Sequence, residues 1–293
     1  MAFWGSNFVA MKYVVGVLPP VGAQLLRYVV AALVMLAYLW RREGSVGLPR
    51  RDLLMVGALG ALGYGGYQML WSTALQSTGA GESALLVAAT PVLVALIAAL
   101  VGTDTLDADK VLGIAVALAG VVVVVAAGRG LELDADLAGP ALTLLADLLW
   151  AVYVALAASV LRRHSSLRMT TWAALAGTAV MVPLGAVQLR QVDLAAVPLL
   201  AWVAILASAL LSVAVGNVVN FRAVRLLGPT RVTNYQFLSP VVAVVVGALL
   251  LREIVLPGHV VGGAVIGAGI LVARGDGRRL LAGAAGRLPG KTV

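Results

Sequence analysis

The chain alternates between long apolar runs and short polar connections. Each run is close to the ~20 residues that a helix needs to cross a bilayer. The pattern predicts an all-α integral membrane protein with ten transmembrane helices. We place these helices at about 2–18, 20–40, 52–75, 82–102, 110–128, 138–161, 168–188, 196–221, 229–251 and 257–273. The composition agrees, because only 12% of the residues are charged, about half the share in soluble domains.

A second pattern repeats along the chain at an offset of 149 residues, which is the separation of Pro91 and Pro240. Around both prolines, a glycine begins an apolar run and an acid ends it. The same offset pairs Gly79 with Gly228, Asp104 with Glu253, Gly113 with Gly262, Gly120 with Gly269, and Gln68 with Asn217. We therefore predict two copies of one five-helix unit, at 1–130 and 138–274, followed by a basic cytoplasmic tail at 275–293.

The basic residues predict an orientation for the helices. If the N-terminus is cytoplasmic, nearly all arginines and lysines of the connections fall inside, and only Arg129, Arg190 and Arg252 fall outside. The positive-inside rule then places both termini in the cytoplasm, with the helices in the inner (plasma) membrane. Because five is odd, the second copy is inserted upside down, an arrangement that recurs in secondary transporters. The first run begins almost at Met1, which favours a true N-terminus upstream of it.

The composition also limits the chemistry. Cysteine is absent, so disulfides and thiolate metal sites are excluded. The sequence contains no phosphate-binding loop, no paired carboxylates within a span and no cluster of metal ligands. We expect no enzymatic activity, no cofactor and no metal. The formal net charge of +8 is spread over the connections, which argues against a nucleic-acid partner.

Three charged residues lie deep within the predicted spans, away from their ends: Lys12, Arg27 and Asp147. A charge at the bilayer centre is costly, so each is expected to face the protein interior or water. Asp147 either couples transport to a proton or cation, or binds a solute ammonium, or forms a structural ion pair with Lys12 or Arg27. Arg27 either is structural or pairs with a solute carboxylate, and Lys12 alternatively extends its amine to the interface.

Polar and aromatic side chains recur at helical spacing in several spans. Amides are costly in lipid unless they are paired, so these side chains are expected to converge on a wetted cavity that holds a solute. The alternative for each is a hydrogen bond between helices. Trp71 and Trp202 are expected in the interfacial aromatic belt instead. The predicted solute-binding residues are Asn7, Tyr67, Gln68, Trp150, Tyr153, Asn217, Asn220 and Tyr235.

Proline and glycine suggest where helices bend and pack. Pro91 and Pro240 are each expected to kink a helix near mid-membrane, as a gating hinge or as a fixed kink. Gly258 with Gly262, and Gly263 with Gly267, form small-residue pairs in the last span. Such pairs allow close helix contacts, either around the cavity or in a homodimer.

Together these features resemble the drug/metabolite transporter superfamily, EamA type. The opening WGSNFVAMK, Arg27 and the repeated Pro…acid helix ends carry the resemblance, which covers nearly the whole chain. One departure is Asp104, where the family usually has glutamate at a helix end. The resemblance implies a transporter of small metabolites that works by alternating access, with export of amino acids or related compounds as the expected activity. The alternatives are a membrane-embedded enzyme or lipid-handling protein, and a passive metabolite channel.

Overall fold

The computed structural model describes residues 2–102, 107–129, 137–227 and 238–273, and all regular structure in these ranges is helical. The unbroken helices are α1 (Ala2–Val15), α2 (Pro20–Glu43), α7 (Ala108–Arg129), α8 (Ala138–Leu161), α9 (Ser166–Leu189), α13 (Leu238–Leu250) and α14 (Pro257–Ala273). The others follow one another in broken stretches: α3 (Arg50–Gly60), η1 (Ala61–Gly66) and α4 (Tyr67–Ala74); α5 (Ala80–Val87) and α6 (Thr90–Leu100); α10 (Leu199–Ala207), η2 (Ser208–Gly216) and α11 (Asn217–Leu227).

Seven helical stretches in the described part of the chain are long and apolar enough to cross a membrane. Three further helices, α1, α13 and α14, coincide with predicted spans but have 14, 13 and 17 residues. The predicted span 229–251 begins outside the described residues. A multi-pass helical membrane protein is therefore confirmed, whereas the total of ten crossings stays a prediction.

Apolar side chains cover the outside of the bundle, and polar ones lie within it. Leu199 and Leu249 are about three-quarters exposed, whereas Arg27 and Asp147 are almost fully buried. This distribution is the reverse of that in a soluble protein, because lipid is as apolar as a leucine side chain. The interior is therefore where polar chemistry is concentrated.

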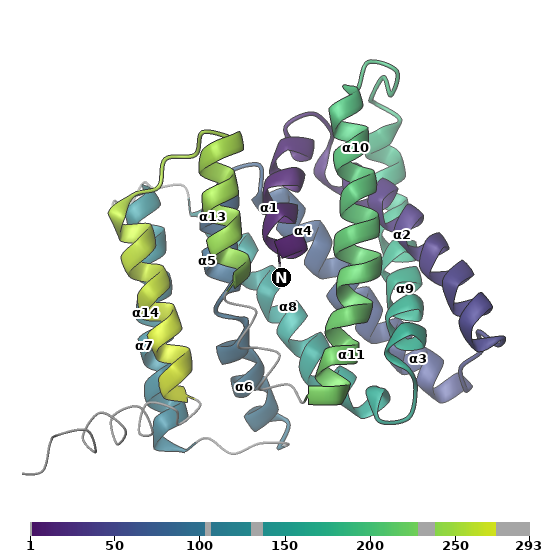
Figure 1. Ribbon diagram of the computed structural model, residues 1–293, viewed down its shortest axis with the longest axis horizontal. Coiled ribbons are helices and arrows are strands. Elements are labelled where there is room, and N and C mark those ends of the chain that lie inside the picture. Colours follow the sequence, from purple (N-terminus) through teal and green to yellow (C-terminus); the bar gives the residue numbers. More distant parts are fainter. Residues whose placement is uncertain (1, 103–106, 130–136, 228–237, 274–293) are drawn as a thin grey trace, which may run out of the picture.

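The helices form a wide bundle with two different edges (Figure 1). At one edge α7 and α14 lie side by side, and at the other α2 packs against α9. Between them, α1 packs against α13 and η2, while α8 packs against α4, α5 and α6. The N-terminal end of α1 lies in the middle of the view, among these central helices.

Glycines hold α7 and α14 in close backbone contact. A Cβ on Gly120 would lie 2.8 Å from the Gly262 carbonyl oxygen, and one on Gly269 would lie 2.6 Å from the Gly113 carbonyl oxygen. Gly258 likewise faces Ala127 of α7. The Gly258 and Gly262 pair therefore packs within the chain. The homodimer that this pair suggested has no support from it and stays untested.

Three of the broken stretches lose regular α-helical hydrogen bonding near their middle. In two of them a π-helical segment, η1 or η2, separates the two α-helices. In the third, residues 88–89 separate α5 from α6, and Pro91 is the second residue of α6. Pro240 is the third residue of α13, and the residues before α13 lie outside those described. Such interruptions free backbone groups and often occur at functional sites.

Polar contacts join connections at the ends of the bundle. After α8, Arg163 and His164 contact the Asp52 carboxylate near the start of α3 at 2.9 Å and 2.6 Å. Beside them Arg168 pairs with Glu43 at 2.8 Å. The α2–α3 and α8–α9 connections therefore lie at the same end of the bundle.

Candidate functional site

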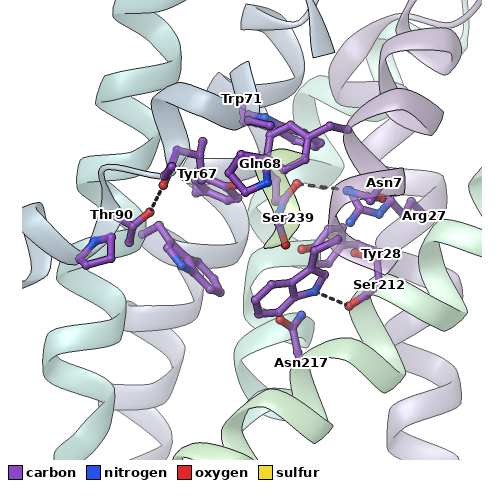
Figure 2. Close-up of a pocket in the computed structure, with 18 residues that line it drawn as sticks. Asn7, Arg27, Tyr28, Tyr67, Gln68, Trp71, Thr90, Ser212, Asn217 and Ser239 are labelled. Atoms are coloured by element: carbon purple, nitrogen blue, oxygen red, sulfur yellow. Dashed lines mark hydrogen bonds between the residues drawn. The ribbon is translucent and has the colours of Figure 1, made fainter. Parts of the chain in front are cut away.

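A cavity of about 120 Å³ lies among the central helices (Figure 2). Its walls come from α1, α2, α4, α5, α6, α8, η2, α11 and α13. The lining residues are Trp4, Asn7, Phe8, Arg27, Tyr28, Tyr67, Gln68, Trp71, Ala84, Val87, Ala88, Thr90, Pro91, Trp150, Ser212, Asn217, Ser239 and Pro240. The interruptions in α5–α6 and in η2 border this cavity, so irregular backbone occurs where it faces a cavity and not lipid.

One wall carries a buried cation. Arg27 of α2 is 2% exposed, and its Nη1 donates to Gln24 Oε1 at 2.9 Å and to Gln68 Oε1 at 3.4 Å. Its guanidinium carbon lies 5.3 Å from the centre of the Tyr28 ring. Its Nε has no hydrogen-bond acceptor among the described residues. This cation is therefore held by neutral groups and not by an acid.

The opposite wall carries Thr90, which links the cavity to a buried acid. Figure 2 shows Thr90 and Tyr67 across the cavity from Arg27 and Asn7. The Thr90 hydroxyl lies 2.5 Å from Asp147 Oδ1 and 2.6 Å from the Val87 carbonyl oxygen. Asp147 of α8 is fully buried and does not line the cavity itself, and its Oδ2 has no partner in the described part of the chain.

The expected ion pair of Asp147 with Lys12 or Arg27 is not formed. The Lys12 amine donates instead to the Leu75 carbonyl oxygen, at 2.6 Å, just beyond the end of α4. The last carbonyls of a helix lack partners within the helix, so a lysine satisfies them well. The two charges nearest the cavity, Arg27 and Asp147, therefore stand apart from each other.

Aromatic rings form the apolar part of the cavity wall. Trp150 lies 5.4 Å from Tyr67, which stacks on Trp71 at 6.2 Å between ring centres. Trp71 is 1% exposed and donates its indole N–H to Ser83 Oγ at 3.1 Å. The expectation that Trp71 belongs to an interfacial belt is therefore wrong. The indole finds its polar partner in the neighbouring helix α5 instead of at the membrane surface.

The first helix contributes hydrogen bonds to the π-helical segment η2. Trp4 Nε1 donates to the Ser212 carbonyl oxygen at 3.2 Å, and the Ser208 hydroxyl donates to Asn7 Oδ1. These contacts hold the N-terminal part of α1 against η2, and they show that carbonyl groups of η2 accept side-chain donors at the cavity.

The structure separates the predicted binding residues into two groups. Asn7, Tyr67, Gln68, Trp150 and Asn217 line the cavity, as do both prolines. Tyr153 does not line it, because this fully buried ring lies behind Trp150, 5.1 Å away, in contact with Gly63. Asn220 lies one turn beyond Asn217 and also does not line it. Tyr235 lies outside the described residues.

Sequence reasoning missed several lining residues, among them Tyr28, Thr90 and Ser212. Tyr28 follows a charged residue in an apolar helix, and Ser212 lies in a run of Ala, Leu and Val. Thr90 did carry a signal, because the 149-residue offset that pairs the prolines also pairs Thr90 with Ser239. A search for polar residues at equivalent places in both copies would have found it.

A polar and aromatic cavity enclosed by helices with an apolar exterior is the arrangement of a membrane transporter. Residues 1–126 and 137–275 each match the EamA-like transporter family. The chain belongs to the EamA-like transporter family.

Individual relatives agree with this assignment. The chain is 30% identical over 289 residues to a "Probable terminal-alkyne amino-acid exporter" of Streptantibioticus cattleyicolor, covering 97% of this chain and 94% of that protein. It is 26% identical to the "Uncharacterized transporter YyaM" of Bacillus subtilis, covering 93% of this chain and 90% of the relative. A solved crystal structure, described only as that of a protein, matches with a TM-score of 0.66 at 20% identity, over 95% of this chain and 94% of the other. This last likeness supports the fold alone.

Proposed function

We propose that this protein is a secondary transporter that exports amino acids or related compounds from the cytoplasm by alternating access. The observation that carries the proposal is the cavity, part of whose polar lining comes from equivalent places in both halves of the chain. Gln68 and Asn217, and Thr90 and Ser239, are separated by the offset that also separates the two prolines. A site built this way lies on the pseudo-two-fold axis, where rocking of the halves opens it to each side in turn.

The inverted repeat, with units at 1–130 and 138–274, is supported by the contacts of α7 with α14. Gly113 packs against Gly269, and Gly120 packs against Gly262. The contacts therefore run forward along α7 and backward along α14, so these equivalent helices are antiparallel. The offset pairs Gly113 with Gly262 and Gly269 with Gly120. It therefore converts the first contact into the second, as a two-fold axis does. The two separate family matches fit the same division.

The orientation with both termini in the cytoplasm is supported by the contacts between connections. The α2–α3 and α8–α9 connections, both predicted to be cytoplasmic, meet through Asp52 with Arg163 and His164. At another place Glu253, predicted to be outside, accepts hydrogen bonds from the start of α5, which is also predicted to be outside. We place the protein in the inner membrane on the same reasoning.

Asp147 is the proposed coupling residue, and its contact with Thr90 suggests that it carries a proton. The Thr90 hydroxyl lies within hydrogen-bond distance of two acceptors, Asp147 Oδ1 and the Val87 carbonyl oxygen. A hydroxyl group has one hydrogen to donate. Either Thr90 shares its one hydrogen between the two acceptors, or it donates to Val87 and a protonated Asp147 donates to Thr90, and the second arrangement makes two full hydrogen bonds. Loss of that proton would change the contacts at the α5–α6 break, which borders the cavity.

The test of the proposed function is counterflow in proteoliposomes that contain the purified protein. The vesicles are loaded with unlabelled amino acids, and uptake of labelled amino acids is followed with and without a pH gradient. We expect saturable exchange that the gradient accelerates in the wild type and not in Asp147→Asn. Asp193→Asn, at an acid outside the helices, is the matched control and should respond to the gradient like the wild type.

The same experiment separates the alternatives. Exchange without a gradient effect would remove the coupling role of Asp147 and leave the carrier. Flux that does not saturate at millimolar solute would indicate a channel. Absence of exchange with every amino acid would overturn the proposed substrate class.

A further inference from the structure

The charge balance of the cavity is uneven, and the imbalance is centred on Arg27. A guanidinium group stays charged in proteins and offers five N–H donors. At Arg27 only Nη1 has hydrogen-bond acceptors among the described residues, and both are amide oxygens. The ion pairs at Asp52 and Glu43 do not involve this residue. Within the described part of the chain, Arg27 is thus a desolvated cation that pairs with no acid.

A second donor without an acceptor lies beside it. Gln24 is fully buried, its Oε1 accepts from Arg27, and its Nε2 has no partner in the described part of the chain. Exchanging the oxygen and nitrogen of this amide would place an N–H against the cation, so the assignment is fixed by Arg27 itself. Two buried donors without acceptors among the described residues therefore lie at Arg27, which lines the cavity, and at Gln24, which is bonded to it. Unpaired buried donors and charges are costly, and an anionic group is what would satisfy them.

The neighbouring residues limit what kind of anion fits. Gln68 and Asn7 lie near Arg27 in the cavity (Figure 2), and Trp150 and Trp71 provide apolar surface in the lining of the same cavity. A planar carboxylate matches the planar fork of a guanidinium group, which binds it through two parallel hydrogen bonds. The apolar remainder of the same solute would then contact the indole rings.

We infer that Arg27 binds the carboxylate group of the transported solute and thereby selects acids over their neutral or amine analogues. This inference rests on the proposed function. It adds that Arg27 recognises the solute and that the solute must carry a carboxylate. It departs from the structural role that the sequence favours, because a structural arginine would be paired with an acid of the protein. Asp147 is not that acid, since its described contact is with Thr90.

The test compares solutes that differ only at the carboxylate. Leucine, leucinamide and isoamylamine share the apolar part, and the last two lack the acid. Binding to the purified protein in detergent is followed by the fluorescence of Trp4, Trp71 and Trp150, which line the cavity. We expect the wild type to bind leucine at least ~10-fold more tightly than leucinamide, as one charge-assisted bidentate contact allows.

Three variants separate charge from structure. Arg27→Gln should reduce the preference for leucine over leucinamide to within about 3-fold, whereas Arg27→Lys should keep part of it because the charge remains. Arg42→Gln is the matched control, since Arg42 is on the same helix but exposed. Folding of each variant is checked by its melting temperature. A purely structural Arg27 would weaken all three solutes together and leave their ratio unchanged.

The outcomes are distinguishable from those of the transport test. A retained preference in folded Arg27→Gln, or equal binding of leucine and leucinamide by the wild type, overturns the inference. Binding is also compared in chloride and in sulfate buffers. If chloride abolishes the preference for leucine at unchanged pH, the anion that binds Arg27 is the inorganic ion, and the inference is overturned in this case too. Arg27-dependent binding of leucine without counterflow supports the inference while removing the proposed transport of amino acids.

Discussion

The α7–α14 contact and the cavity both contain pairs of residues that are 149 positions apart in the sequence, but the residues in the two places are of different kinds. In the α7–α14 pair, glycines bring two backbones together, and apolar side chains surround the contact. In the cavity, the related residues are polar, and a charged residue lies at each of two opposite walls, with Arg27 at one and Asp147 behind the other. The offset pairs Arg27 with the uncharged Ala176, so the charge of Arg27 breaks the symmetry.

The difference shows how a repeated chain separates stability from function. Where the offset relates glycines of α7 and α14, the contact is made by closely packed backbone and apolar side chains. At Arg27, whose equivalent residue is the uncharged Ala176, Nε has no hydrogen-bond acceptor among the described residues, and Oδ2 of the buried Asp147 likewise has no partner there. Natural proteins accept such local cost at functional sites. The predictions below test this contrast.

The largest expected effect is at the α7–α14 contact. In Gly269→Ala, the new Cβ would lie 2.6 Å from the Gly113 carbonyl oxygen and closer still to the Ala117 nitrogen. Both are backbone atoms, so the helices must separate, at a cost of about 3 kcal/mol. At ~2–4 °C for each kcal/mol, the melting temperature in detergent should fall by roughly 6–12 °C.

Gly267→Ala is the matched control, because it makes the same change two residues away in the same helix. A Cβ there meets nothing within 4 Å, and alanine favours helix by up to ~1 kcal/mol over glycine. We expect an unchanged or slightly higher melting temperature. Equal losses in the two variants would mean that the close contact of α7 and α14 is not what these glycines provide.

The sequence could predict this contact only in part, and the cavity less well. Apolar runs predict helices reliably because lipid leaves the chain few alternatives, and the offset pairs Gly113 with Gly262 and Gly120 with Gly269. The same offset brings Gln68 and Asn217 to one cavity. The offset does not reveal that Asp147 contacts Thr90 or that Lys12 contacts a backbone carbonyl. Several polar groups lie within reach of a charged side chain, and the sequence does not show which of them it bonds. Tyr153 shows a further limit, since residues three apart share a helix face but need not share a cavity.

An intermediate effect is expected where the acid meets the cavity wall. Thr90→Val keeps the shape of the side chain but leaves the buried Asp147 carboxyl without its hydrogen-bond partner. An unsatisfied buried group of this kind costs about 2 kcal/mol. The melting temperature should therefore fall by roughly 4–8 °C, and acceleration of counterflow by a pH gradient should weaken.

Ser239→Ala is the corresponding change in the other half of the chain, since Ser239 lies at the equivalent place and also lines the cavity. Asp147 bonds Thr90 and not this serine, so we expect the response to the gradient to stay at the wild-type level. A loss of that response in both variants would contradict the view that the acid makes the cavity asymmetric.

The smallest expected effect is at Glu253, which lies between the two compared regions, on the connection from α13 to α14. Its Oε1 accepts from the Ala80 N–H at 2.6 Å and its Oε2 from the Gly81 N–H at 3.0 Å. These N–H groups begin α5, where a helix lacks internal acceptors and carries a partial positive charge. Glu253→Gln removes the charge and turns one acceptor into a donor. The cost is about 1 kcal/mol, or a fall of roughly 2–4 °C in the melting temperature.

The effect of Glu253→Gln should also depend on salt in a way that the glycine substitutions do not. Part of the contribution of a charge at a helix end is screened by ions, so the difference from wild type should shrink between low and high salt. Asp193→Asn, at an exposed acid that accepts from the Ala195 N–H, provides the control and should change stability by less than ~0.5 kcal/mol. Gly269→Ala acts through steric overlap alone, so its loss should be the same at both salt concentrations. If the loss of stability in Glu253→Gln does not depend on salt, Glu253 contributes through packing, as the glycines of the α7–α14 contact do. Its carboxylate would then not act as an electrostatic cap for α5, the helix that leads into the cavity.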